Sequence, residues 1–192
     1  MTFDKLADRC LLFIDERKQM LIELLKEAEL EMTRKCNMYE DTRSFACSGS
    51  ETYGLPSNFK QIIHLQHDGN TLTAVNENDI SFNSSNDVES GPPSVYYIRN
   101  FGVHLDTKPG SGSILLSYYG TVDNIQDDST TPSPIIPELY HRDLCDYAIS
   151  IASAKQSPDL HLKYLQMWNN SLNEIKNEEA DRELVHSVRR EV

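Results

Sequence analysis

The sequence predicts an α+β fold: a helical bundle, with a long N-terminal helix and two C-terminal helices, that carries an inserted small antiparallel β-sheet and an extended C-terminal arm. Two observations lead to this prediction. Near both ends of the 192-residue chain, apolar residues recur at spacings of three and four, as on one face of a helix. In the middle, short runs of β-branched and aromatic residues alternate with turn residues, which is typical of strands.

The change of pattern divides the chain into four segments. Residues 1–40 form an N-terminal helical segment, and residues 41–137 form an antiparallel β-domain. Residues 138–176 contain the C-terminal helices, which we expect to pack on the first helix, and residues 177–192 form a C-terminal arm. A chain of 192 residues is long enough for one well-filled core, or for one domain with projecting helices.

The first helix is expected from residue 3 to about residue 36, and Thr2 can cap its N-terminus. The apolar stripe lapses from Glu16 to Gln19, but neither proline nor glycine occurs before Gly49. The pattern therefore leaves open whether this helix is continuous or broken once. The stripe consists of Phe3, Leu6, Cys10, Phe13, Ile14, Leu21, Leu24, Leu25, Ala28 and Met32.

A β-meander of three strands is expected from Gly91 to Tyr119. Val95–Arg99 is rich in β-branched and aromatic residues, Asn100–Gly102 can turn, and a second turn leads into Ser113–Tyr119. Upstream, His67-Asp68-Gly69-Asn70 is a strong hairpin signal. The strands expected before the meander are Thr42–Ser48, Lys60–Gln66 and Leu72–Val75.

Helical periodicity returns at Glu138 and is interrupted at Ser157-Pro158, because proline ends one helix and is tolerated in the first turn of the next. The second helix can continue to the C-terminus, and its apolar stripe ends at Ile175. Polar residues then dominate, which indicates an arm rather than a core helix. The arm ends in a short apolar and basic patch, formed by Leu184, Val185, Val188, Arg189 and Arg190.

The net charge of −12 argues against some classes of partner. Residues 41–137 contain 4 basic and 11 acidic residues, and no segment is basic enough for the phosphate contacts that dominate nucleic-acid affinity. The first ten residues lack the apolar core of a secretion signal, and no run approaches the ~20 apolar residues of a membrane span. We expect no stable DNA or RNA binding, no visible secretion signal and no membrane insertion.

The candidate chemical motifs are better explained as structure. His64 and His67 lie three apart on an expected strand, so their side chains point to opposite faces and cannot readily share a metal. The Pro109–Ser113 turn lacks the lysine of a phosphate loop. We predict no catalytic residue, no metal or small-molecule site and no cofactor. Four cysteines are expected to be free thiols made in a reducing compartment, namely Cys10, Cys36, Cys47 and Cys145.

Several short motifs follow one another in a particular order between a helical start and a final helical pair. They are Tyr53-x-Leu55-Pro56-x-x-Phe59, Asp68-Gly69-x-x-Leu72, Gly91-Pro92-Pro93-x-x-Tyr96, Pro109 to Gly112 and Leu115-x-x-Tyr118-Tyr119. In this order and spacing the chain resembles the head-to-tail adaptor (connector) proteins of tailed bacteriophages. The resemblance covers roughly Leu6 to Ile175, and none of its motifs is catalytic.

The resemblance implies a structural virion protein rather than an enzyme. Such adaptors assemble as a dodecameric ring beneath the portal, extend the DNA channel and provide the attachment platform for the tail. The implied partners are the portal protein, a tail tube or nozzle protein and other copies of this chain, while double-stranded DNA passes without specific binding. The implied location is the head-tail neck of a virion, after synthesis in the host cytoplasm.

The C-terminal arm extends beyond the part of the chain that the resemblance covers. We expect its apolar and basic patch to contact the portal or a neighbouring subunit; the patch is formed by Leu184, Val185, Val188, Arg189 and Arg190. Two other classes of function remain open. A β-rich ligand-binding module with helical decoration would also explain the sheet, and a monomer that binds a small ligand would favour it. A hydrolase with a dispersed active site is the third possibility.

Overall fold

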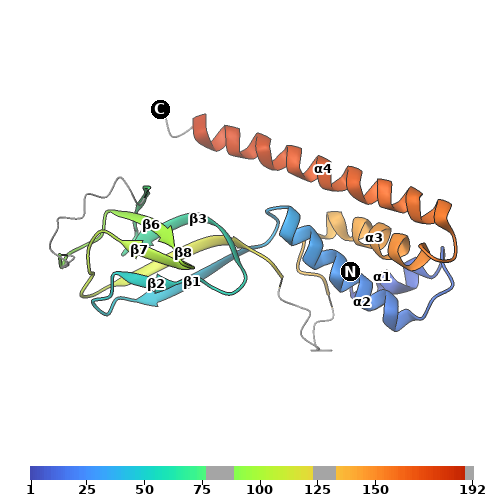
Figure 1. The fold of residues 1–192 in the computed structure, drawn as a ribbon, viewed down its shortest axis with the longest axis horizontal. Helices are drawn as coiled ribbons and strands as arrows, with labels where there is room; N and C mark the ends of the chain where they lie inside the picture. The colour runs from blue at the N-terminus through green and yellow to red at the C-terminus, as the bar shows by residue number, and fades with distance from the viewer. Residues whose placement is uncertain (77–88, 123–132, 189–192) are drawn as a thin grey trace. The chain divides into compact units, whose positions relative to one another are not determined.

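The structure is a computed structural model that describes residues 1–76, 89–122 and 133–188, with the backbone alone for residues 181–188. The chain folds as two compact units. The helical unit comprises Met1–Tyr39 and Thr121–Val192, and the sheet unit comprises Glu40–Gly120 (Figure 1). Each unit has its own cluster of buried apolar side chains.

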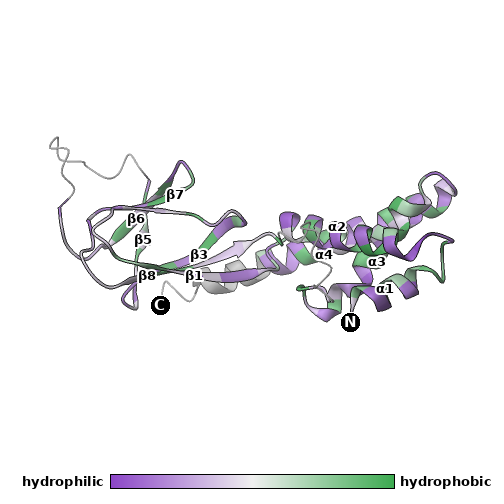
Figure 2. Cartoon of the chain, turned by 90° about the horizontal axis from the view of Figure 1, so that it is seen from below, coloured by the Kyte–Doolittle hydropathy of each residue, from purple (hydrophilic) through white to green (hydrophobic). Residues whose placement is uncertain are grey.

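The helical unit contains helices from both ends of the chain. In order they are α1 (Phe3–Cys10), α2 (Lys18–Lys35), the short 3₁₀ helix η2 (Glu138–Tyr140), α3 (His141–Ser153) and α4 (Pro158–Val188). Apolar and polar residues alternate along these helices (Figure 2), as expected where one face of each helix is buried. Thr2 caps α1 by accepting a hydrogen bond from the backbone N–H of Lys5 at 3.3 Å.

The long N-terminal helix expected from the sequence is two helices. A tight turn ends α1, since the backbone N–H groups of Leu12 and Phe13 bond to carbonyls only three residues earlier. Lys18, the first residue of α2, then forms ion pairs with Asp4 and Asp8 of α1 at 2.9 and 2.6 Å. The break comprises residues 11–17, so it begins before the lapse of the apolar stripe at Glu16–Gln19 and overlaps it only at Glu16 and Arg17. The two ion pairs hold the start of α2 beside α1.

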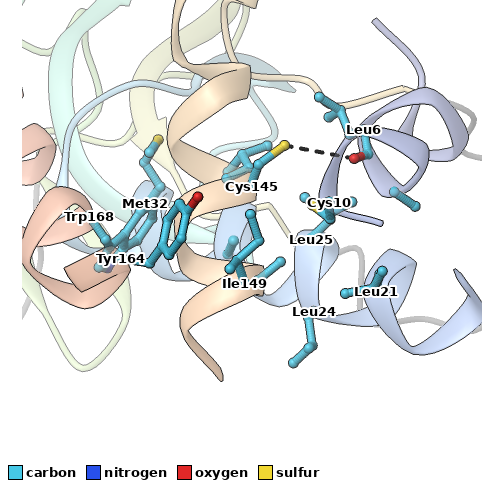
Figure 3. Close-up of a cluster of buried hydrophobic side chains, with 14 of the residues drawn as sticks. Leu6, Cys10, Leu21, Leu24, Leu25, Met32, Cys145, Ile149, Tyr164 and Trp168 are labelled. Carbon is cyan, nitrogen blue, oxygen red and sulfur yellow. Dashed lines mark hydrogen bonds between the residues drawn. The ribbon is translucent and has the colours of Figure 1, made fainter. Parts of the chain in front are cut away.

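The core of the helical unit draws on all four α-helices (Figure 3). Trp168 of α4 is 1% exposed and its ring lies 5.2 Å from that of Tyr147 on α3. The stripe predicted for the first helix supplies most of the N-terminal contribution, but Phe13 lies in the turn after α1 and is 53% exposed. Other fully buried members of the core are Leu6, Leu21, Leu25, Met32, Leu144 and Ile149.

The described residues of the sheet unit form two four-stranded sheets. The first sheet has the order β1 (Glu40–Ala46), β8 (Ser113–Gly120), β3 (Phe59–His67) and β4 (Asn70–Thr71). The second sheet has the order β2 (Thr52–Gly54), β7 (Gly102–Leu105), β6 (Val95–Arg99) and β5 (Thr73–Ala74). One buried cluster takes side chains from both sheets, among them Leu65, Val103, Leu105, Ile114 and Leu116.

The predicted fold class, a helical bundle with an inserted small antiparallel sheet, is therefore wrong. The insertion is a β-rich unit with two sheets and a shared core, and its β5–β6 pair is parallel. The sequence suggested one sheet because β2, β4 and β5 contain only two or three residues each. Strands this short show no alternation of apolar and polar residues.

Candidate functional site

The C-terminal helix α4 is fixed to the helical unit as far as two adjacent glutamates. Glu178 accepts a hydrogen bond from the Tyr140 hydroxyl at 3.3 Å, and Glu179 accepts one from the backbone N–H of Asn37. Asn37 follows α2 directly, so Glu179 holds the segment through which the chain leaves the helical unit. These contacts lie beyond Ile175, where the sequence predicted that packing would end.

The terminal patch that the sequence predicted as an interface follows these contacts in the chain. Residues Leu184, Val185 and Val188 belong to the last turns of α4, where the backbone is helical. Arg189 and Arg190 lie outside the described residues. A helix brings residues at spacings of three and four to one face, so the backbone places Leu184, Val185 and Val188 on neighbouring positions. Val188, the last of these three residues, therefore lies nine positions beyond Glu179 on the same helix.

The sheet unit presents an apolar side chain that the sequence analysis did not single out. Phe101, in the turn between β6 and β7, is 90% exposed, and Ile98 of β6 is 49% exposed. Asn100 and Phe101 have φ angles of +48° and +58°, in the left-handed region. That region is uncommon for a bulky residue, which stays there only when the surrounding structure holds it. The turn signal at Asn100–Gly102 was visible in the sequence, but the exposure of Phe101 was not.

The base of this β6–β7 hairpin is firmly held. His104 bonds through Nδ1 to the Thr52 hydroxyl at 3.0 Å and through Nε2 to the Arg99 carbonyl at 3.2 Å. Its ring also stacks on Tyr97 with centroids 4.9 Å apart. A side chain at position 102 would meet the Thr52 methyl group at 3.2 Å, so glycine suits this close approach of β2 and β7. The hairpin therefore holds Phe101 at a defined position on the sheet unit.

A polar pocket of about 330 Å³ lies on the first sheet and includes a serine–histidine pair. The Ser117 hydroxyl and His64 Nε2 are 3.1 Å apart, which is the spacing of a nucleophile and its base. However, His64 and Ser117 are directly paired in the register of β3 and β8, so sheet geometry alone brings them together. Glu40, Asp41, Thr42 and Ile63 complete the lining. We interpret the pair as a cross-strand hydrogen bond.

The two histidines considered as metal ligands have separate partners. His64 bonds to Ser117, whereas His67 Nε2 lies 3.3 Å from the Ser111 carbonyl oxygen. Across the described ranges, no group of three or more His, Cys, Asp or Glu side chains could hold a metal ion. In the same ranges, no helix has the length and apolar character needed to cross a membrane.

Buried polar groups fasten the chain where it returns to the helical unit. Glu29 of α2 is fully buried, and its Oε1 accepts hydrogen bonds from the backbone N–H groups of Ile135 and Ile136, the latter at 3.1 Å. Its Oε2 is buried and has no hydrogen-bond partner among the described residues, and burial raises the pKa of this carboxyl. Thr33, one turn later, accepts from the backbone N–H of Val122 at 3.2 Å. Nothing in the sequence distinguished Glu29 from the exposed glutamates of α2.

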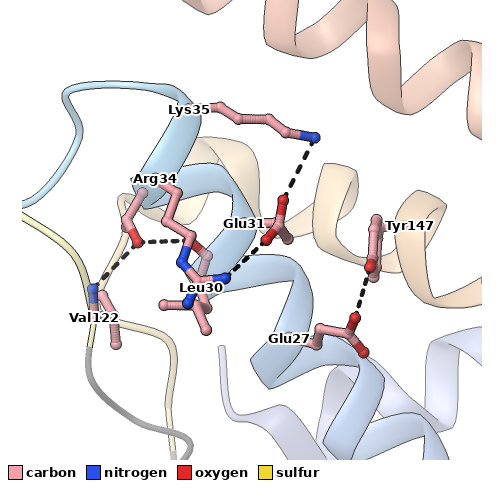
Figure 4. A network of polar contacts seen from close by, with 8 residues as sticks. Glu27, Leu30, Glu31, Arg34, Lys35, Val122 and Tyr147 are labelled. Atoms are coloured by element: carbon pink, nitrogen blue, oxygen red, sulfur yellow. Dashed lines mark hydrogen bonds and ion pairs between the residues drawn. The ribbon is translucent and has the colours of Figure 1, made fainter.

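The exposed side of α2 carries ordinary surface pairs (Figure 4). Glu31 pairs with Arg34 at 3.0 Å and with Lys35 at 3.5 Å, and Glu27 accepts a hydrogen bond from the Tyr147 hydroxyl at 2.9 Å. Exposed pairs of this kind contribute little to stability. They make α2 a structural element rather than a reactive site.

Comparison with known proteins identifies a family that this chain matches. A family model described as "SU10 adaptor protein" matches residues 1–190, which include both units of the structure. A search of curated proteins finds no match to this chain.

Proposed function

Because this chain belongs to the SU10 adaptor protein family, a family of structural phage adaptors, we propose that it is a head-to-tail adaptor that forms a ring beneath the portal. In this role the ring extends the DNA channel and provides the attachment platform for the tail. The observation that carries the proposal is the family match over residues 1–190. Since the match spans both units, the role belongs to the whole chain and not to one unit.

The proposed partners are the portal protein, a tail tube or nozzle protein and further copies of this chain, in a ring of twelve. The C-terminal arm is the proposed contact with the portal or the next subunit, through Leu184, Val185, Val188, Arg189 and Arg190. The course of α4 supports this, because the helix continues to Val188, beyond its contacts at Glu178 and Glu179. A helix that projects past its own core can bind in a groove of another chain.

The proposed relation to DNA is passage without specific binding. The chain has a net charge of −12, and the sheet unit has 4 basic and 9 acidic residues between positions 40 and 120. An acidic surface repels phosphates, so DNA would not be retained by it. The protein acts as a structural component of the virion neck, is made in the host cytoplasm and has no catalytic role.

Mixing the purified chain with the portal protein of the same phage tests the assignment. We expect native mass spectrometry to give a portal complex with twelve added chains, and electron microscopy to show a ring on one end of the portal. Portal particles that remain bare at micromolar adaptor concentration would contradict the proposal. A stable monomer that binds a small ligand would instead support the ligand-binding alternative.

Two truncations separate the arm from the anchoring contacts. A chain that ends at Asp181 keeps Glu178 and Glu179, so it should fold like the full-length chain and lose portal or subunit binding. A chain that ends at Asn177 also loses the contacts to Tyr140 and Asn37, and it should be less stable as well. Circular dichroism and thermal unfolding measure the folding of both. Full assembly by the chain that ends at Asp181 would contradict the proposed role of the arm.

A further inference from the structure

Two of the four cysteines meet inside the helical unit, at the packing surface of α1 and α3. Cys10, the last residue of α1, is 0% exposed, and Cys145 of α3 is 3% exposed. The Cys145 thiol donates a hydrogen bond to the Leu6 carbonyl at 3.8 Å (Figure 3). In an α-helix the carbonyl of residue i faces the backbone of residue i+4, so this bond places the Cys145 sulfur beside the Cys10 end of α1.

The two thiols also interact with each other. The hydrogen bond to Cys145, together with burial, raises the pKa of Cys10, and the hydrogen bond from Cys10 lowers the pKa of Cys145. The Cys10 thiol therefore favours the charged form of Cys145. A thiolate next to a second thiol is the arrangement of an attacking and a resolving cysteine.

The remaining cysteines, which also lie in the described part of the chain, have different surroundings. The Cys36 thiol points to the Leu172 carbonyl at 4.0 Å, and Cys47 is in the sheet unit beside Tyr53. A buried free cysteine is usually a small apolar side chain. That explanation suffices for Cys36, but it does not account for two buried thiols from separate helices that lie beside the same turn of α1.

We propose that Cys10 and Cys145 are an oxidisable dithiol that forms a disulfide between α1 and α3 in the presence of a small-molecule disulfide such as oxidised glutathione. The Cys145 thiolate attacks one sulfur of the glutathione disulfide and releases one glutathione thiolate, which leaves a mixed disulfide on Cys145. The Cys10 thiol then loses its proton to water, attacks the Cys145 sulfur and releases the second glutathione as a thiolate. Two protein thiols thus lose two electrons and two protons, and one disulfide is reduced to two thiols.

The oxidant reaches the pair by local opening of α1. This helix has eight residues and begins at residue 3, and short terminal elements open at lower cost than the rest of a domain. Once formed, the bond would close a loop between positions 10 and 145 and prevent α1 from separating from α3. This inference does not depend on the proposed adaptor role, since it concerns the isolated chain.

Peptide mapping of the full-length protein tests the proposal. After incubation with oxidised glutathione at pH 8, the free thiols should fall from four to two per chain, and the non-reduced digest should contain the Cys10 and Cys145 peptides joined. Dithiothreitol should restore four thiols. Four alkylatable thiols after oxidation, or a bond that involves another cysteine, would overturn the proposal.

Thermal unfolding gives a second readout. The oxidised chain should unfold at a Tm higher by roughly 5–15 °C than the reduced chain, because a long loop is closed in the unfolded state. Cys47→Ser, the control that keeps the pair, should show the same rise, and Cys10→Ala should show none. If Cys10→Ala does not fold, the peptide map of the unmodified protein still tests whether the disulfide forms. A joined peptide without a rise in Tm would overturn the inference that the native packing accommodates the bond.

Discussion

The helical unit buries carboxyl groups, whereas the most exposed large apolar side chain among the described residues belongs to the sheet unit. Glu29 is 0% and Asp146 is 5% exposed, and Glu29 holds the backbone of its own unit. The sheet unit exposes a large aromatic residue, Phe101, in a left-handed backbone conformation. Substitutions at buried positions of the helical unit should therefore change mainly stability, whereas Phe101 can be replaced at little cost to folding.

The two cores also differ in size. Among the described residues, twenty-one buried apolar residues form the cluster of the helical unit, against nine in the sheet unit. Because apolar burial is the main favourable term in folding, we expect the helical unit to supply most of the chain's stability. The following predictions test this contrast, from the largest expected effect to the smallest.

Replacing Trp168 with alanine should have the largest effect. Its indole is 1% exposed and packs against Tyr147, so truncation should cost about 3–5 kcal/mol in the free energy of unfolding. Urea unfolding followed by circular dichroism at 222 nm measures this. Leu162→Ala, on the same helix at 61% exposure, is the control and should change stability by less than about 0.5 kcal/mol. Equal losses in the two variants would show that burial on α4 does not determine stability.

The sequence predicted the buried face of α2 correctly. The residues of the apolar stripe between Leu21 and Met32 are buried as expected, because a helix repeats its pattern over several turns. The two-sheet architecture was not predictable from strands of two or three residues, such as β4 and β5, whose partners are chosen by tertiary packing.

The sites were less predictable than the helices. The interaction of Cys10 with Cys145, and of Glu29 with Ile136, joins residues more than 100 positions apart. No local pattern encodes such pairs, since each residue alone looks like any helical cysteine or glutamate. The hairpin signal at Asn100–Gly102 marked the turn correctly, but exposure depends on what the rest of the fold leaves uncovered.

Substitution of Glu29 should have the second-largest effect on the free energy of unfolding. The sign of this change should depend on the residue that replaces Glu29. Glu29→Ala removes the acceptor of the buried Ile136 N–H and of the part-buried Ile135 N–H, and it should cost about 3 kcal/mol. Glu29→Gln keeps an oxygen acceptor and removes the buried charge, so it should not destabilise the chain at neutral pH.

The pH dependence of the Glu29 variants provides the control. The folded-state pKa of Glu29 is raised above its usual value of 4.5 by burial, so its contribution to stability is present below pH 4.5 and is lost as the pH rises through the folded pKa. The stability of Glu29→Gln relative to the unmodified chain should therefore increase with pH. If the two chains differed by the same free energy of unfolding in urea at pH 4 and at pH 8, the charge of Glu29 would not destabilise the folded chain.

The substitution Asp146→Asn should have a smaller effect on the free energy of unfolding, and it should stabilise the chain. Burial and the neighbouring Asp143 raise the pKa of Asp146 from 3.8 to about 6. Its contribution to stability is thus present below pH 3.8 and is lost as the pH rises through about 6, so Asp146→Asn should stabilise the chain by about 2 kcal/mol at pH 7. Carbon-detected NMR titration of the carboxyl measures the pKa directly. A midpoint near 3.8 would contradict the prediction.

Phe101→Gly should have the smallest effect on stability and should act on the sheet unit. Glycine adopts φ of +58° without strain, so this change should stabilise the unit by up to about 1 kcal/mol, whereas Phe101→Ala keeps the strained Cβ and should not. Trp168 is the only tryptophan, so its fluorescence reports the helical unit alone, while circular dichroism near 215 nm also follows the strands. Equal stability of Phe101→Gly and Phe101→Ala in urea unfolding would show that the left-handed backbone at position 101 does not strain a residue with a Cβ atom.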